Sequence, residues 1–147
     1  MPELDLTTAA YFADKEAILE SGRLKIGVTA YNPRRLSYKL DGRASFLAPS
    51  KSLLAAYRSE QIDDDEFDRR YLEHLDNVGI VVIRKSLELI ALRGGNPRLV
   101  LLCYEDVSKG LNCHRRTFAD FWEQQTGQAI PELAASAIQL TLGGKSK

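Results

Sequence analysis

The pattern of apolar and polar residues in the first thirty positions predicts a helix followed by a strand. Thr7 or Thr8 offers a hydroxyl that can cap a helix, and the apolar positions after it recur at ragged helical spacing as far as Ser21-Gly22. Apolar and polar residues then alternate over residues 24–29, as in a strand with one buried face. We therefore expect the chain to open with a helix and to place its first strand after that helix.

Two further helices are predicted in the middle of the chain, each with a side chain that can cap its first turn. Ser50 is the expected cap of the first, whose inward residues are Leu53, Leu54 and Tyr57. Asp63 or Asp64 caps the second, and its acidic first turn suits the positive end of the helix dipole. The inward face of this second helix comprises Phe67, Tyr71, Leu72 and Leu75.

The stretch Val78–Arg93 fits either a buried strand followed by a helix or one helix throughout. Residues 79–83 form a short apolar run, but the apolar face then continues as far as Gly94. Its later members are Leu87, Leu89, Ile90 and Leu92. Because the stretch is longer than an ordinary strand and Gly94 suits the position after a helix C-terminus, the pattern favours one helix.

The clearest strand signal in the chain is the unbroken apolar run within Arg98–Tyr104, which is typical of a strand covered on both faces in a parallel sheet. A loop over residues 105–112 follows it. An amphipathic helix is then predicted over about Cys113–Thr126, and Gly127 is expected to end it.

The last residues are expected to add little to the architecture. Pro131–Leu133 should start a short final element, and residues 143–147 should form a frayed tail. The whole order predicts one α/β domain over residues 1–147, with a few-stranded, mainly parallel sheet packed by several helices.

Composition narrows the class of partner and the compartment. The 147 residues are 44% apolar and 27% charged, which is typical of a soluble globular protein. The basic and acidic side chains balance, so a partner held by bulk charge, such as duplex DNA or an anionic membrane, is not expected. The start of the chain lacks the features of a signal peptide, which predicts a cytoplasmic protein. Two cysteines are too few for a disulfide framework, and we expect both to be reduced thiols.

The residues with the most chemical potential lie at the start of the last predicted helix, where positions 113–116 read Cys-His-Arg-Arg. Free backbone N–H groups in a first helical turn attract anions, and guanidinium groups bind phosphate or carboxylate with paired hydrogen bonds. Because Arg115 and Arg116 oppose the helix dipole, their position favours an anion or an acidic group beside them. Alternatively, Glu105 or Asp106 pairs with one of these arginines across the loop.

The ends of the predicted strands point to the same region. In parallel α/β sheets, ligands bind beyond the carboxyl ends of the strands. Cys103 and Tyr104 lie at such an end, and a parallel first strand would add Tyr31, Arg34 and Arg35.

Three residues are candidates for catalysis. Glu105 or His114 could act as a general acid or base, and Cys113 as a nucleophile, because a helix N-terminus beside histidine and arginine lowers a thiol pKa. Cys103 can also be read as a small buried apolar residue. The spacing of cysteine and histidine does not match a metal site, so neither a metal nor a cofactor is expected.

Two separated segments carry motifs that occur together in one protein family. The first contains Phe46–Tyr57 and Glu66–Tyr71, similar to L-A-P-S…L-L-x-x-Y and E-x-x-x-R-Y. The second contains Leu101–Glu105 and Cys113–Arg116, similar to L-L-C-Y-E…C-H-R. With these motifs the chain resembles, over about residues 24–133, the bacterial, archaeal and phage family catalogued as domain of unknown function 488.

The resemblance implies an α/β fold in which the two motif blocks meet at one pocket, and it brings no established activity. The positions it implies are Ser50, Arg70, Tyr71, Cys103, Tyr104, Glu105, Cys113, His114 and Arg115. Each also has a structural role open to it: Ser50 as a helix cap, Tyr71 as a packing residue and Arg70 as a partner of a carboxylate.

Together these features predict a pocket for a small anionic, nucleotide-derived molecule. Arg115, Arg116 and the helix N-terminus would bind its phosphate, and Tyr31, Tyr38 or Tyr104 would stack on its base. The molecule would either be turned over, in a hydrolase or transferase reaction, or only be held. The alternatives are a non-catalytic regulatory or phage protein that sequesters a nucleotide signal, and, less favoured, a nucleic-acid-binding module.

Overall fold

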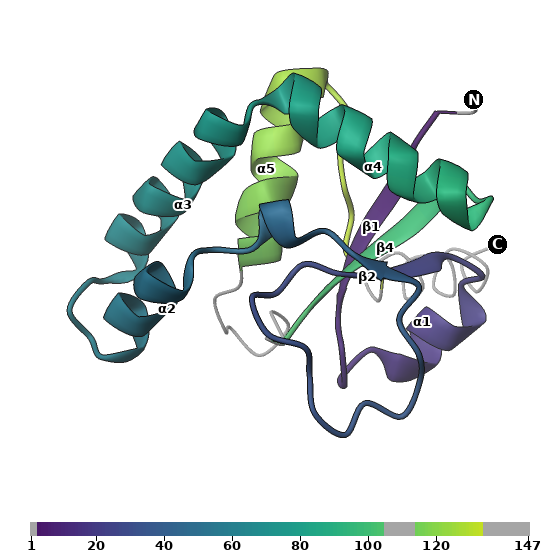
Figure 1. Cartoon of the computed structure of the whole chain (residues 1–147), viewed down its shortest axis with the longest axis horizontal. Coiled ribbons are helices and arrows are strands. Elements are labelled where there is room, and N and C mark those ends of the chain that lie inside the picture. Colours follow the sequence, from purple (N-terminus) through teal and green to yellow (C-terminus); the bar gives the residue numbers. More distant parts are fainter. Residues whose placement is uncertain (1–2, 105–113, 134–147) are drawn as a thin grey trace, which may run out of the picture.

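The computed structural model describes residues 3–104 and 114–133. Within this part of the chain, five α-helices accompany a four-stranded sheet (Figure 1). The elements in chain order are β1 (Asp5–Ala10), α1 (Lys15–Glu20), β2 (Leu24–Gly27), β3 (Gly42–Arg43), a 3₁₀ helix (Ser45–Leu47), α2 (Lys51–Arg58), α3 (Asp64–Val78), α4 (Ile80–Gly94), β4 (Arg98–Cys103) and α5 (His114–Thr126).

The sheet has the strand order β1-β4-β2-β3, and every pair is parallel. The predicted α/β class and parallel sheet are therefore confirmed. β4 lies between β1 and β2, so that Leu99 pairs with both Leu6 and Leu24. Its central position explains why its sequence is apolar without interruption.

The two faces of the sheet are covered by different helices. Alternate β4 residues, Leu99 and Leu101, share a core with buried residues of α3, α4 and α5. The residues between them, Val100 and Leu102, pack with Ile18 of α1 on the opposite face. This two-sided burial follows from the period of two along a strand.

The first element differs from its prediction. Residues 5–10 form strand β1, and Thr7 and Thr8 lie inside this strand instead of capping a helix. The helix is confined to Lys15–Glu20 and ends at Ser21, as expected. The physical reason is that the small residues of β1 are almost all buried and show no alternation, so neither period is visible in the sequence. The strand over residues 24–27 is thus the second one.

Both predicted caps in the middle of the chain are confirmed. Ser50 Oγ accepts a hydrogen bond from the backbone N–H of Leu53 at 3.1 Å, which starts α2. Asp63 Oδ1 accepts one from the backbone N–H of Glu66 at 2.8 Å, which starts α3. Each cap satisfies one of the backbone donors left free at a helix start.

Helix α4 is confirmed, and glycines set both of its ends. Gly79 has φ +88°, a backbone conformation that favours glycine, and it separates α3 from α4. At the other end the left-handed residue is Gly95, with φ +68°, and not the predicted Gly94. Gly94 has a different role, since a Cβ there would lie within 3 Å of the Leu24 side chain. The absence of a side chain lets α4 approach β2 closely.

Three leucines that the pattern placed on inward faces are exposed. Leu72 of α3 is 36% exposed, while Leu89 and Leu92 of α4 are 44% and 65% exposed. The face of a helix that packs against the core covers only part of its circumference, and each of these leucines lies outside that face.

The end of the described chain also adds a contact that the sequence did not suggest. Gly127, with φ +80°, follows α5 as predicted. Beyond it, the backbone N–H of Thr8 donates to the carbonyl of Pro131, and Thr8 forms a parallel bridge with Glu132. Residues 130–132 therefore lie along the outer edge of β1. None of the helices in residues 3–104 and 114–133 is long and apolar enough to cross a membrane.

Candidate functional site

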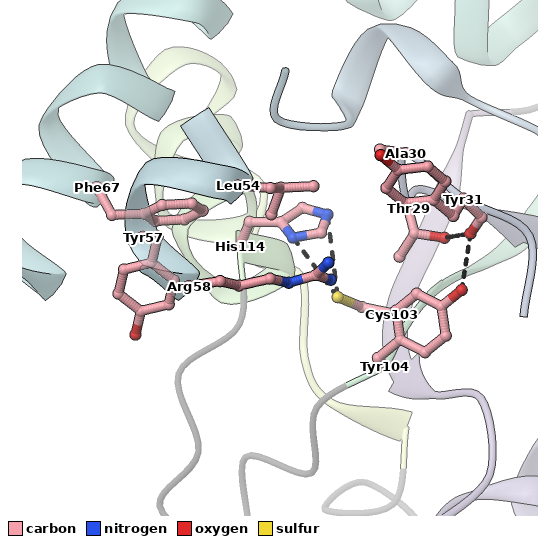
Figure 2. Close-up of a pocket in the computed structure, with 10 residues that line it drawn as sticks. All are labelled: Thr29, Ala30, Tyr31, Leu54, Tyr57, Arg58, Phe67, Cys103, Tyr104 and His114. Atoms are coloured by element: carbon pink, nitrogen blue, oxygen red, sulfur yellow. Dashed lines mark hydrogen bonds between the residues drawn. The ribbon is translucent and has the colours of Figure 1, made fainter. Parts of the chain in front are cut away.

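A cavity of about 120 Å³ lies where β2 and β4 end and α5 begins. Because the two strands are parallel neighbours, the residues after them meet at one edge of the sheet. The described residues that line it come from the segment after β2, from α2 and α3, from the end of β4 and from the start of α5: Thr29, Ala30, Tyr31, Leu54, Tyr57, Arg58, Phe67, Cys103, Tyr104 and His114 (Figure 2).

His114 is the first residue of α5, and its imidazole is fixed inside the protein. The ring is 7% exposed, and its Nε2 lies 2.8 Å from the carbonyl oxygen of Val28. The oxygen can only accept, so Nε2 carries the hydrogen and Nδ1 does not. Tyr71 packs edge-on against the ring, with 5.4 Å between the ring centroids.

The protonation state of His114 follows from this burial. Burial lowers the pKa of His114 from 6.5 to about 4, with the positive charge of Arg115 acting in the same direction. At neutral pH the ring is uncharged, and its one N–H is already bound to Val28. In this geometry His114 has no proton to give to a ligand, which leaves the acid role predicted for it without support.

Cys103 ends β4 and is 2% exposed. Its Sγ lies 3.5 Å from Nδ1 of His114. The expectation of a reduced thiol is wrong for this residue, because Cys103 is disulfide-bonded in the structure. A sulfur in a disulfide is not a thiolate nucleophile. Cys113, the other predicted thiol, lies outside the described residues, as does Glu105.

One wall of the cavity is a hydrogen-bonded group of hydroxyls. The phenol of Tyr104 donates to the carbonyl oxygen of Tyr31 at 2.9 Å, and the hydroxyl of Thr29 donates to the same oxygen at 2.8 Å (Figure 2). Tyr11 bonds to the Thr29 hydroxyl at 2.8 Å and packs edge-on against Tyr104. Burial raises the pKa of both phenols, so this wall is uncharged at neutral pH.

Arg58 provides the positive charge of the cavity. It is the last residue of α2, where a cation also suits the negative end of the helix dipole. Figure 2 shows its guanidinium extended toward the side chains of His114 and Cys103. Among the described residues that line the cavity, none is a carboxylate. The sequence did not single out Arg58, because basic residues are common in the last turn of a helix, where they interact favourably with the helix dipole.

The two arginines predicted to bind an anion are held elsewhere. Arg115 is 1% exposed and binds the carboxylate of Glu132 with two nitrogens, Nη2 at 2.8 Å and Nε at 3.1 Å. Arg116 Nη1 donates to the Thr8 hydroxyl at 2.8 Å and to the Ile130 carbonyl at 2.9 Å. Neither lines the described part of the cavity. The arginines have an acidic partner, as one alternative expected, but in the described chain it is Glu132, which holds residues 130–132 against β1.

The residues implied by the first motif block are divided between structure and site. Leu54 and Tyr57, from L-L-x-x-Y, line the cavity beside the residues of the second block, so the two blocks do meet. Tyr71 is fully buried, and its hydroxyl donates to the carbonyl oxygen of Leu47 at 2.6 Å. Ser50, the cap of α2, lines a separate, more open cavity together with Arg70.

The remaining predicted residues do not reach the cavity. Arg34 and Arg35 follow β2, as expected, but both are exposed and neither lines it. Tyr38 is also outside it, with its hydroxyl bonded to the carbonyl of Tyr11 at 2.6 Å. Within the part of the chain that the structure describes, no three metal-ligating side chains gather at one point.

The fold and the cavity define a class: a parallel α/β domain with a pocket at the carboxyl ends of its strands. The family comparison agrees with the motifs, since a family model described as "Active DUF488-N3 subclade" matches residues 11–126. The chain therefore belongs to the DUF488 family. No curated protein and no solved structure shows a significant match to it.

Proposed function

We propose that the chain binds a small anionic, nucleotide-derived molecule in the cavity beside His114, and that Arg58 binds its anionic group. The observation that carries the proposal is the combination of one guanidinium with aromatic walls and no carboxylate among the described lining residues. A positive charge in a partly apolar site attracts an anion, and flat side chains suit a base.

The size of the cavity limits which part of the ligand enters it. About 120 Å³ holds a group the size of a base or a phosphate, and sites for whole drug-sized ligands are on the order of 300 Å³ or more. The rest of the ligand would lie at the mouth, where Tyr31 is 46% exposed. Lys51 Nζ is 4.9 Å from the centroid of that ring and adds a second positive charge there.

This proposal keeps the ligand class expected from the sequence and changes the residues that bind it. Because Glu132 forms ion pairs with Arg115 and Arg116, we assign the contact with the anion to Arg58 instead. Cys103, Tyr104 and His114 keep their predicted place in the site. Tyr104 would pack against the ligand, and neutral His114 would shape the floor.

Turnover and simple retention of the ligand remain two forms of the proposal. The family description contains the word "active" without naming a reaction, which favours turnover. Glu105 keeps its predicted role as a general acid or base in that form, whereas the predicted nucleophilic role of Cys113 requires that the disulfide of Cys103, the other of the chain's two cysteines, is first reduced. A protein that only sequesters its ligand would use the same binding residues.

A thermal-shift screen with wild type and Arg58→Gln tests the binding. The ligands are mononucleotides, dinucleotides, cyclic nucleotides and NAD derivatives, and ligand at about a hundred times its Kd adds roughly 2.7 kcal/mol of stability. We expect a shift that Arg58→Gln abolishes. The control is Arg34→Gln, which removes an exposed arginine outside the cavity and should keep the shift.

Three results separate the outcomes. A shift that survives Arg58→Gln refutes the assignment of the anion to this residue. When a ligand binds, mass spectrometry after incubation distinguishes turnover, which changes its mass, from retention. The absence of any shift, together with oligonucleotide binding that falls steeply with salt, would overturn the proposal in favour of nucleic-acid binding.

A further inference from the structure

Helix α4 is apolar on two sides. Its inner side, with Ile83, Leu87 and Ala91 buried, packs against the sheet. Its outer side carries four of the large apolar residues that the structure exposes: Val81 at 64%, Val82 at 53%, Leu89 at 44% and Leu92 at 65%. In Figure 1 this helix runs along the periphery of the molecule. Within residues 3–104 and 114–133, no core cluster includes these four side chains and none of them lines the proposed pocket.

The outer side has the spacing of a helix–helix seam. Val81, Lys85, Glu88 and Leu92 follow one another at intervals of four, three and four residues. These are the intervals between the contact positions of a coiled coil, which bring side chains onto one stripe of a helix. Val82 and Leu89 flank this stripe and widen its apolar surface. The outer stripe of α4 therefore has apolar residues at its two ends and one charge pair at its centre.

We propose that a second copy of this chain packs antiparallel along the outer stripe of α4, about a twofold axis through the middle of the helix. Such an axis places Val81 opposite Leu92 of the second copy, and it does so twice. It also places Lys85 opposite Glu88 of the second copy, again twice. The stripe is thus complementary to itself, which a twofold interface requires.

The charges distinguish this arrangement from a parallel one. In a parallel pair, Lys85 would face Lys85 and Glu88 would face Glu88, and like charges at such positions repel. The antiparallel pair replaces both repulsions with attractions. Partner choice and orientation in coiled coils are set in the same way by charged residues.

The length of the helix limits the strength of the dimer. Fifteen residues at about 1.5 Å each give a contact about 22 Å long. With a helix diameter of about 10 Å, this contact covers a few hundred Å² on each partner, less than the roughly 800 Å² of a standard interface, so we expect self-association in the micromolar range. The pocket lies at the carboxyl ends of the strands, whereas α4 ends beside the amino end of β4, so the pocket of each copy stays open.

Sedimentation velocity over about 5 to 500 µM tests the proposal with the whole chain. We expect a monomer that converts to dimer with concentration, and a rise of at least about tenfold in the dimer Kd for Leu92→Glu. Leu19→Glu is the matched control, because Leu19 is a leucine of α1 that is 50% exposed. It should associate like the wild type. A wild type that stays monomeric throughout, or an equal loss in both variants, would overturn the proposal.

Charge exchange tests the antiparallel register. Lys85→Glu and Glu88→Lys each place like charges across the axis and should weaken the dimer, whereas the double variant restores opposite charges and should recover it. Both substituted positions lie on the helix surface, and thermal unfolding of each of the three variants checks that it is folded. Failure of the double variant to recover the dimer would refute the register.

Discussion

The buried imidazole of His114 makes the stability of the fold depend on pH in a defined direction. Burial lowers the pKa of His114 from 6.5 to about 4 in the folded chain. A group with a lowered basicity in the folded state takes up its proton more readily when the chain unfolds. The full stability is therefore present above pH 6.5, and it is lost progressively as the pH falls from 6.5 toward 4.

The size of this loss follows from the two pKa values. At about 1.4 kcal/mol for each pH unit between 6.5 and about 4, the loss amounts to about 3 kcal/mol. Urea unfolding of the wild type and of His114→Gln at several pH values between 7 and 4 measures it. The glutamine amide can still donate to the carbonyl of Val28 but does not titrate, and carboxylates contribute equally to both proteins.

The difference between the two proteins isolates the imidazole. We expect His114→Gln to be less stable than the wild type at pH 7. As the pH approaches 4, the free energy of unfolding of the wild type should fall by about 3 kcal/mol more than that of the variant. Stability curves that run parallel over the whole range would refute the reasoning, because they would mean that folding does not change the proton affinity of His114.

Substitutions at three positions test other parts of the fold by urea unfolding. Tyr71→Phe removes the donor to the buried Leu47 carbonyl and should cost about 1–3 kcal/mol; unchanged stability would contradict this bond. Glu132→Ala removes the carboxylate from buried Arg115 and should cost about 3 kcal/mol, while Glu132→Gln should recover part of it; equal losses in the two variants would show that the ion pair is not the cause. Gly79→Ala should cost about 1–3 kcal/mol through the backbone, because φ is +88° and a Cβ there meets no atom within 4 Å; a neutral effect would contradict this conformation.

Local signals in the sequence were sufficient to predict those parts of the structure that depend on residues close together in the chain. Ser50 and Asp63 each cap a helix by accepting a hydrogen bond from the backbone N–H of the residue three positions later. The unbroken apolar sequence of β4 predicts that the strand is buried on both faces, and it is. β1 was not predicted, because its structure depends on residues that are distant in the sequence. Its hydroxyls can cap a helix or bond across a sheet edge, and the choice depends on β4, Pro131 and Glu132, which all lie far away in the sequence.

The site was predictable to the extent that parallel strands place their ends together. Cys103, Tyr104 and His114 were expected there and line the cavity. Arg58 was not expected, because its entry into the cavity depends on how α2 packs against α3, which in turn packs against α5. The pairing of Arg115 with Glu132 joins residues from two elements, and no local pattern distinguishes a paired arginine from one that awaits a ligand.

The strand order also determines when the sheet can form during synthesis. β4 is the last of the four named strands to be made, yet it lies between β1 and β2. A nascent chain that ends before Arg98 has a β1 with no neighbouring strand and a β2 with only the two-residue β3 beside it. The sheet closes by insertion of β4 between segments made much earlier, a folding step with long sequence separation and hence a slow one. Until the ribosome has released residue 103, the first two-thirds of the chain exposes apolar strand surfaces that chaperones can bind.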